Sequence, residues 1–310
     1  MVGIHHVTAI AGRPNQNFEF YTRTLGLRFV KRTVNFDDPG TYHFYYGDEA
    51  GSPGSILTFF PWEHAGAGRG GVGLTQATAF RVPEGSIGFW TQRLVAAGAK
   101  HEAPIKRFGE CVLEFSDPDG MGLALVGVPA AENEPGWTTG DIPAEHAIRG
   151  FHGVTLMLDS VEPTAAILTG VLGFKEVGRV RPYVRFKSEG TIGTIVDIRE
   201  AKGFLPGRMG RGSVHHVAFR AKDDAEQAEI AKKLRAEHGL IATEQRDRNY
   251  FRSIYFREPG GILFEIATDA PGFTVDEPLA SLGTALKLPR FLEAQRSKIE
   301  AVLPALEVAA

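Results

Sequence analysis

Two histidine pairs and one glutamate are the residues of this chain whose types could hold a metal ion. His5 and His6 lie in the short apolar run GIHHVTAI, and His215 and His216 lie in the similar run SVHHVAFRA. Glu265 lies in the middle of the apolar run ILFEIAT. A carboxylate at such a place is expensive to bury unless it is paired or bound to a metal ion.

One imidazole from each pair, together with Glu265, would form a set of two histidines and one carboxylate. This set leaves adjacent coordination positions open on a non-haem Fe2+ ion. Successive side chains of a strand alternate between faces, so only one histidine of each pair can face a common cavity. The other would point away or lie beside the ligand. One such pair alone is usually only a pair of polar residues, but the matched pairs and Glu265 together indicate a metal site.

The pairs belong to two of four similar segments, which we call modules one to four. Their first strands are predicted at 3–10, 75–82, 150–157 and 213–221. Amphipathic segments that predict helices follow at 16–24, 86–99, 161–171 and 224–239. Three alternating runs come next in each module, with turn sequences such as DPDG and EPGG before the last run. The repeat predicts an α+β fold of four βαβββ modules that form two domains of paired modules.

The modules differ at the second position of the histidine pair. His6 and His216 occupy it in modules one and four, whereas our alignment places Gln76 and Gly153 there in modules two and three. In the last strands, Glu265 aligns with Phe59, Ala124 and Asp197. The comparison therefore predicts His6, His216 and Glu265 as the metal ligands.

Module three holds two competing residues, His152 and Asp197, which each lack a partner there and are interpreted as structural. His152 aligns with His5, and this offset of one residue from His6 turns a strand side chain to the opposite face. We therefore expect modules one and four to pair across the ends of the chain. The predicted division is a metal-binding domain (1–70 and 213–270), a non-metal domain (71–130 and 149–212), a linker (131–148) and a C-terminal tail with a helix (271–310).

The composition is that of a globular protein with small partners. The 310 residues include 34 Lys and Arg and 37 Asp and Glu, for a formal net charge of −3, which gives no reason to expect nucleic acid or an anionic membrane as a partner. The sequence shows neither a secretion signal nor an apolar run that could span a bilayer. The single cysteine, Cys111, cannot form an internal disulfide. These features predict a cytoplasmic protein.

The chain resembles the vicinal oxygen chelate superfamily, which includes glyoxalases, bleomycin resistance proteins and dioxygenases. The most specific segments are LGLRFVKRTVNFDDPGTYHFYYGD near the start and DRNYFRSIYFREPGG near the end. They resemble ring-cleaving enzymes of the hydroquinone-dioxygenase type, often labelled glyoxalase-family proteins. The resemblance implies an extradiol-type dioxygenase in aromatic compound degradation. Such an enzyme uses O2, a hydroquinone or catechol, and Fe2+, with Mn2+ as the alternative metal. It implies the same three ligands, with substrate-facing residues at His5, Thr8, His215, Arg248 and Tyr255.

Physical roles for these residues follow from their chemistry. Arg248 could stabilise a phenolate by a charge-assisted hydrogen bond, and Tyr255 and His215 are candidate proton donors or acceptors. The alternatives are a glyoxalase-like metalloisomerase or lyase, and a non-catalytic binding or resistance protein of the same fold. An isomerase site usually has a fourth protein ligand, which Phe59 in the aligned position of module one would not supply. The tail could be a packing element or part of a homo-oligomer interface.

Overall fold

The computed structural model describes residues 3–307, so residues 1–2 of module one and 308–310 of the tail lie outside the described part. The predicted α+β fold of four βαβββ modules is confirmed. Module one comprises β1 (Ile4–Ala11), α1 (Pro14–Glu19) with a π-helical turn (Phe20–Thr24), β2 (Arg28–Asn35), β3 (Asp38–Gly47) and β4 (Ile56–Pro61). Module two comprises β5 (Leu74–Pro83), α2 (Ile87–Ala96), β6 (Ile105–Arg107), β7 (Glu110–Ser116) and β8 (Gly122–Val128).

The other two modules repeat this order of elements. Module three comprises β9 (Phe151–Leu158), α3 (Glu162–Ala166) with a π-helical turn (Ile167–Val171), β10 (Lys175–Val180), β11 (Tyr183–Lys187) and β12 (Ile195–Glu200). Module four comprises β13 (Ser213–Ala221), α4 (Asp224–His238), β14 (Arg246–Asp247), β15 (Arg252–Arg257) and β16 (Leu263–Thr268). The tail ends in α5 (Arg296–Val302). No helix among residues 3–307 has the length and apolar character needed to cross a membrane.

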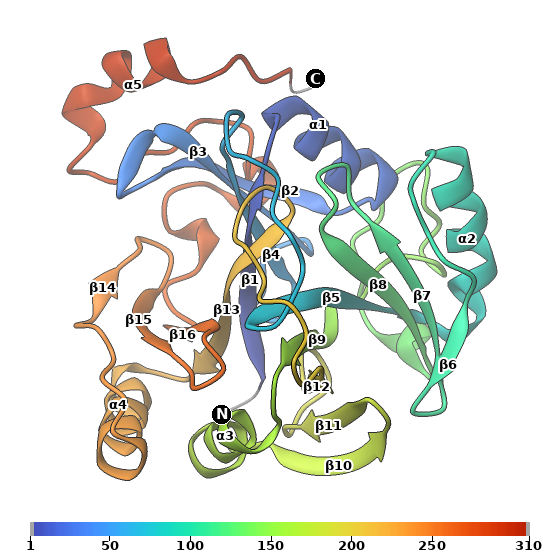
Figure 1. Ribbon diagram of the computed structural model, residues 1–310. Coiled ribbons are helices and arrows are strands. Elements are labelled where there is room, and N and C mark those ends of the chain that lie inside the picture. Colours follow the sequence, from blue (N-terminus) through green and yellow to red (C-terminus); the bar gives the residue numbers. More distant parts are fainter. Residues whose placement is uncertain (1–2, 308–310) are drawn as a thin grey trace.

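The strands form two curled eight-stranded sheets, each a half-barrel (Figure 1). Modules four and one form one sheet, in the order β14-β15-β16-β13-β1-β4-β3-β2. Modules three and two form the other, in the order β10-β11-β12-β9-β5-β8-β7-β6. The first strands of the paired modules, β1 and β13, run antiparallel at the centre of their sheet, as β5 and β9 do in theirs. The first sheet therefore brings together β1 and β13, which start about 200 residues apart in the chain.

One apolar core joins the two sheets. The rings of Phe80 and Phe151 stack with centroids 5.3 Å apart between the modules of the second sheet. Phe174 of module three meets Phe219 of module four edge to face, with centroids 5.8 Å apart. All four rings are buried; Phe80, Phe151 and Phe219 lie on strands, and Phe174 directly precedes β10. The two sheets are therefore packed together, and the division of the chain at the residue boundaries given above stays a prediction.

Every central strand of the two sheets contains one extra residue, a β-bulge. In the β1–β13 pair the register skips His5 on one strand and His215 on the other. In the β5–β9 pair it skips Gln76 and His152. A bulge sets two residues of one strand opposite one residue of its partner and re-aims the local side chains. The first histidine of each pair is thus the extra residue, and the second stands in the regular register.

The bulges correct our alignment at two positions. Gln76 corresponds to the first histidine of the pairs, so the residue of module two that matches His216 is Ala77. In the last strands, Glu265 pairs with Ala218, and the equivalent residue Thr8 of β1 pairs with Thr58. The position that matches Glu265 in module one is therefore Thr58, not Phe59. The alignment shifted by one because sequence similarity does not show where a strand gains a residue.

The tail packs against module one, where it covers β2 and β3 at the top of the view in Figure 1. Lys31 on β2 is fully buried, and its Nζ lies 2.7 Å from carboxylate oxygens of both Asp276 and Glu277. Leu288, Leu292 and Ile299 of the tail form a small apolar cluster with Val34. The packing role expected for the tail is thus present in the single chain.

Candidate metal centre

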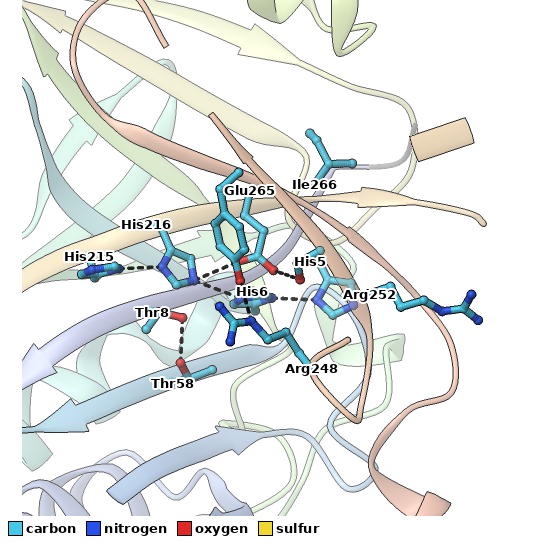
Figure 2. Close-up of polar contacts among 12 residues, drawn as sticks. His5, His6, Thr8, Thr58, His215, His216, Arg248, Arg252, Glu265 and Ile266 are labelled. Carbon is cyan, nitrogen blue, oxygen red and sulfur yellow. Dashed lines mark hydrogen bonds and ion pairs between the residues drawn. The ribbon is translucent and has the colours of Figure 1, made fainter. Parts of the chain in front are cut away.

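Three strands bring His6, His216 and Glu265 together at the centre of the first sheet (Figure 2). Nε2 of His6 lies 3.3 Å from Nε2 of His216. Oε2 of Glu265 lies 3.4 Å from the first of these nitrogens and 3.0 Å from the second. All three residues are buried. The three atoms form a nearly equilateral triangle.

The triangle fits a single divalent ion. Ligand atoms about 2.1 Å from one ion are about 3.0 Å apart at right angles and about 3.4 Å apart at the tetrahedral angle, which is the range seen here. Oε2 of Glu265 is buried and has no hydrogen-bond donor of acceptable geometry in the described chain, although both imidazoles face it. Two imidazole nitrogens and a carboxylate oxygen that converge on one point are the donor set expected of a metal site.

The histidine beside each candidate ligand holds that ligand in place. Nδ1 of His5 lies 2.9 Å from Nδ1 of His6, and Nδ1 of His215 lies 2.8 Å from Nδ1 of His216. An imidazole that binds a metal through Nε2 commonly donates its Nδ1–H to a neighbour, which fixes its tautomer and orientation. The bulges make this contact possible, because they bring consecutive side chains toward each other instead of onto opposite faces.

Glu265 is fixed on its other side by module four itself. Ser253 on β15 donates its hydroxyl hydrogen to Oε1 of Glu265, which leaves Oε2 toward the imidazoles. Burial opposes ionisation of this carboxyl, but the facing His6 and His216 outweigh it and hold the pKa of Glu265 well below its ordinary value. Burial lowers the pKa of His216. A carboxylate and neutral imidazoles are the forms in which these residues bind metals.

A cavity of about 330 Å³ opens above the three residues. This size is in the usual range for a small-molecule site. Its walls are largely aromatic, with polar groups from the β2–β3 turn and the segment before β15. The lining comprises His6, Asn35, Phe36, Asp37, His43, Tyr45, Phe60, Trp62, His215, His216, Thr243, Arg246, Arg248, Phe251, Tyr255, Leu263 and Glu265.

Arg248 and Tyr255 form one polar wall of the cavity. Nε of Arg248 donates to the Tyr255 hydroxyl oxygen at 3.2 Å, and its Nη2 donates to Asp37 at 3.2 Å. Burial disfavours the charged guanidinium, but Tyr255 and Asp37 raise the pKa of Arg248, so it stays cationic. Burial and the Glu265 carboxylate raise the pKa of Tyr255, so it stays protonated. This wall presents a fixed cation and a hydroxyl hydrogen.

The residues expected around the substrate lie in two groups. His215, Arg248 and Tyr255 line the cavity, and the expectation that only one histidine of a pair faces it is wrong for His215 and His216. His5 and Thr8 are not among the lining residues. His5 is the bulged residue behind His6, where it packs against the Phe251 ring, and Thr8 is fully buried with its hydroxyl 2.8 Å from that of Thr58.

Strand β3 builds a side of the cavity that was not predicted from the sequence. His43 and Tyr45 line it, and they stand two residues apart in TYHFYYGD. Side chains two apart on a strand share a face, so this alternation was the available signal. It was obscured because Tyr42, Phe44 and Tyr46, on the other face, are also large and aromatic.

Comparisons with known proteins agree with this geometry. Residues 3–125 and 150–266 match the family model described as Glyoxalase/Bleomycin resistance protein/Dioxygenase superfamily. A Bacillus subtilis strain 168 protein named "Putative ring-cleaving dioxygenase MhqO" is 46% identical over 311 residues, 99% of this chain and 97% of its own. The "Chlorohydroquinone/hydroquinone 1,2-dioxygenase" of Sphingobium indicum is 32% identical over 303 residues, 96% of this chain and 94% of its own.

Solved structures extend the comparison to the fold. The crystal structure of a "putative dioxygenase" from Bacillus subtilis superposes with a TM-score of 0.95 at 46% identity, covering 99% of this chain and 98% of the other. Glyoxalase I from Zea mays superposes with a TM-score of 0.66 at 15% identity, covering 86% of this chain and 92% of the other. At that identity the second likeness concerns the fold alone.

Proposed function

The chain belongs to the Glyoxalase/Bleomycin resistance protein/Dioxygenase superfamily, and from this premise we propose that it is a metal-dependent ring-cleaving dioxygenase. Its substrates are small aromatic diols of the hydroquinone or catechol type, and its metal is Fe2+, with Mn2+ as the alternative. The observation that carries the proposal is the triangle of His6, His216 and Glu265 at the floor of an aromatic cavity. Relatives of 46% and 32% identity that carry dioxygenase names support it.

His6, His216 and Glu265 would hold the metal ion through Nε2, Nε2 and Oε2. An Fe2+ ion in such a three-ligand site supplies open positions for an aromatic hydroxyl and O2, and hence an extradiol-type ring opening. The protein fixes the three ligands through His5, His215 and Ser253, so little reorganisation is needed when substrate arrives. The aromatic walls of the cavity exclude water from the diol ring and stack against it.

Arg248 and Tyr255 handle charge and protons on the cavity wall. The Arg248 guanidinium stabilises the negative charge that develops on a substrate oxygen when its hydroxyl is deprotonated. Tyr255 accepts a hydrogen bond from Arg248, so its own hydroxyl hydrogen is available to a substrate oxygen. His215 is neutral, since burial and the neighbouring His216 lower its pKa to about 3, and it lines the cavity as a further polar contact.

The isomerase alternative is less well supported because of the residue at the fourth position. Thr58 occupies the place in module one that Glu265 occupies in module four. A threonine hydroxyl is a weak ligand compared with a carboxylate, so the site lacks the second glutamate typical of the isomerase. A binding protein without catalysis would have no need for the converging ligands.

Anaerobic loading with Fe2+ followed by oxygen uptake measurements tests the proposal. We expect O2 consumption with hydroquinone or catechol, and a product whose mass exceeds that of the substrate by one O2. Apo protein and protein loaded with Zn2+ are the controls, and both should be inactive. Isomerisation of a glutathione hemithioacetal without O2 uptake on any dihydroxybenzene would contradict the proposal.

A further inference from the structure

A chain of four hydrogen-bonded side chains runs through module one to the cavity wall. The Thr8 hydroxyl oxygen lies 2.8 Å from that of Thr58, which lies 2.9 Å from Nε2 of His43. Nδ1 of His43 lies 2.9 Å from the Tyr45 hydroxyl oxygen. Figure 2 shows the first link, between β1 and β4. Tyr45 and His43 line the cavity, whereas Thr8 and Thr58 are fully buried below it.

The internal repeat relates this chain of hydrogen bonds to the polar wall that Arg248 and Tyr255 form in module four. Tyr45 pairs with Thr58 across β3 and β4, as Tyr255 pairs with Glu265 across β15 and β16. Tyr45 is thus the counterpart of Tyr255 in module one. The cavity has a tyrosine hydroxyl at each of two related positions, and only one of them has an arginine as its partner.

The number of polar hydrogens determines whether the four hydrogen-bonded groups can donate a hydrogen bond to a ligand. Burial lowers the pKa of His43 well below its ordinary value, so its ring is neutral and carries one N–H. The four groups therefore hold four polar hydrogens between them, and the three hydrogen bonds use three. One hydrogen is left over, and it lies on Thr8, on Thr58 or on Tyr45.

The two ends are not equivalent. Thr8 is fully buried, does not line the cavity and has no polar partner except Thr58 within residues 3–307. Thr58 is fully buried as well, so a hydroxyl hydrogen left over on either threonine would be an unsatisfied buried donor, which is costly. Tyr45 lines the cavity, where a ligand or water can accept the hydrogen. The favoured direction is therefore Thr8 to Thr58, Thr58 to Nε2 of His43, and Nδ1–H of His43 to the Tyr45 oxygen.

We propose that Tyr45 donates its hydroxyl hydrogen to the substrate oxygen that the metal does not hold, and that His43, Thr58 and Thr8 are positioning residues that fix this direction. The inference rests on the proposed function and specifies its substrate. Both oxygens of a 1,2-diol can bind one metal ion, which leaves none for Tyr45. The oxygens of a 1,4-diol lie on opposite sides of the ring, so the second one needs a partner on the protein. Tyr45 therefore selects for the 1,4-diol.

Ligand binding under anaerobic conditions tests the inference without turnover. Calorimetric affinities of Fe2+-loaded protein are compared for hydroquinone, 4-methoxyphenol, phenol and catechol. We expect Tyr45→Phe to weaken hydroquinone and 4-methoxyphenol by about 3- to 10-fold, the value of one neutral hydrogen bond, and to leave phenol and catechol unchanged. Tyr46→Phe is the matched control, since Tyr46 is the next residue of β3 and donates to Asn17 away from the cavity.

The pattern of losses separates the possible outcomes. If Tyr45→Phe changes all four affinities equally, or none of them, Tyr45 does not bind the second oxygen and the inference is wrong. If 4-methoxyphenol binds the unmodified protein no better than phenol, Tyr45 accepts instead of donating, and the inference is wrong as well. If the unmodified protein binds none of the four compounds, the proposed function fails together with the inference. Retained iron in the variants shows that their folds are intact.

The donor-to-acceptor direction of the hydrogen bonds from Thr8 to Tyr45 can be measured separately. We expect the Nδ1–H tautomer of His43, measured from imidazole ¹⁵N shifts of the Zn2+-loaded protein and assigned by comparison with His43→Gln. The Nε2–H tautomer would mean that Tyr45 donates to His43, and this would contradict the inference even if Tyr45 contacts the substrate.

Discussion

At the residue scale, the metal centre depends on which histidine of each pair stands in the regular register of its strand. His6 and His216 do so, and each presents Nε2 toward Glu265. His5 and His215 are bulged residues that face Nδ1 of the candidate ligands. His152 is the bulged residue of module three, so it corresponds to His5 and not to His6.

Alanine at these positions separates ligand from structural histidine. His6→Ala should reduce the iron retained after anaerobic loading and desalting to the background level, because two remaining ligands rarely hold a labile divalent ion. His152→Ala is the matched control, and it should keep its iron and most of its oxygen uptake. Metal analysis of both variants checks this. Iron lost from the His152 variant and kept by the His6 variant would mean that our assignment of the ligands is wrong.

At the element scale, the second sheet has the same strands and bulges but fills the ligand positions differently. The residues that match His6 and His216 are Ala77 and Gly153. A Cβ atom on Gly153 would lie 2.1 Å from the carbonyl oxygen of Ile195, so no larger residue fits there. The second sheet therefore cannot build the two-histidine arrangement, for steric reasons that belong to the strand pairing.

In the second sheet, an arginine neutralises the carboxylate that matches Glu265. Arg185 occupies the position of Tyr255, and its guanidinium donates to both oxygens of Asp197 at 2.8 and 2.9 Å. It also pairs with Glu110, which lies 3.0 Å from Nε2 of His152. This network explains why Asp197 and His152 occur in an apolar module without a metal ion. The structural role expected of both residues stays a prediction, which the His152→Ala variant tests for His152.

Removal of the Arg185 guanidinium should strongly destabilise the protein. Arg185→Leu leaves two carboxylates with their cation gone, and breaking a buried pair in this way costs about 3–5 kcal/mol in the free energy of unfolding. Arg179→Leu on β10 is the control, because its pair with Glu176 is largely exposed and solvent screens it, so its loss should change the stability little. Chemical denaturation of both variants measures the difference, and equal stabilities would contradict the role given to Arg185.

The same network predicts a response to acid. Burial opposes ionisation of Glu110, but His152 and Arg185 hold its pKa down to about 2. Because this pKa is lower in the folded state, the carboxylate stabilises the fold above its ordinary pKa of 4.5, and the contribution is lost as the pH falls toward 2. Glu110→Gln should therefore show a flatter loss of thermal stability than the unmodified protein between pH 4.5 and 3, and parallel curves would refute this.

At the scale of the whole molecule, the tail connects the outer strands of module one to the cavity wall of module four. Asp276 accepts a hydrogen bond from the Tyr250 hydroxyl at 3.0 Å and pairs with Lys31 at 2.7 Å. Phe251, next to Tyr250, lines the cavity and packs against His6 with ring centroids 4.8 Å apart. The tail thus stabilises the site although it supplies none of the three candidate ligands.

Lys31→Met should loosen the tail from the sheet. The substitution leaves Glu277 buried without its cation, a loss of about 3–5 kcal/mol for a buried pair. We expect faster proteolytic cleavage within residues 279–303 and a lower melting temperature, with iron still retained. Lys232→Met on α4 is the control, since its pair with Glu229 is exposed. If the tail of the Lys31 variant resists protease as well as that of the control, the buried pair does not hold it.

The sequence by itself determined the repeated modules, their order of elements and the three candidate ligands. These features are encoded locally, because an apolar alternation, an amphipathic helix or a carboxylate in an apolar run is visible within ten to twenty residues. The sequence also showed that module one has no carboxylate at the position that matches Glu265, although our alignment named Phe59 there instead of Thr58.

Only the tertiary structure decided which side chains meet beyond that. A bulge is a property of two paired strands, and β1 and β13 lie about 200 residues apart in the chain, so neither sequence shows the extra residue alone. For the same reason, the contact of His5 with His6, the exclusion of Thr8 from the cavity and the hydrogen-bond chain from Thr8 to Tyr45 appeared only in the folded protein. Local periodicity determines which face of a strand a side chain takes, and the pairing of distant strands determines what that face meets.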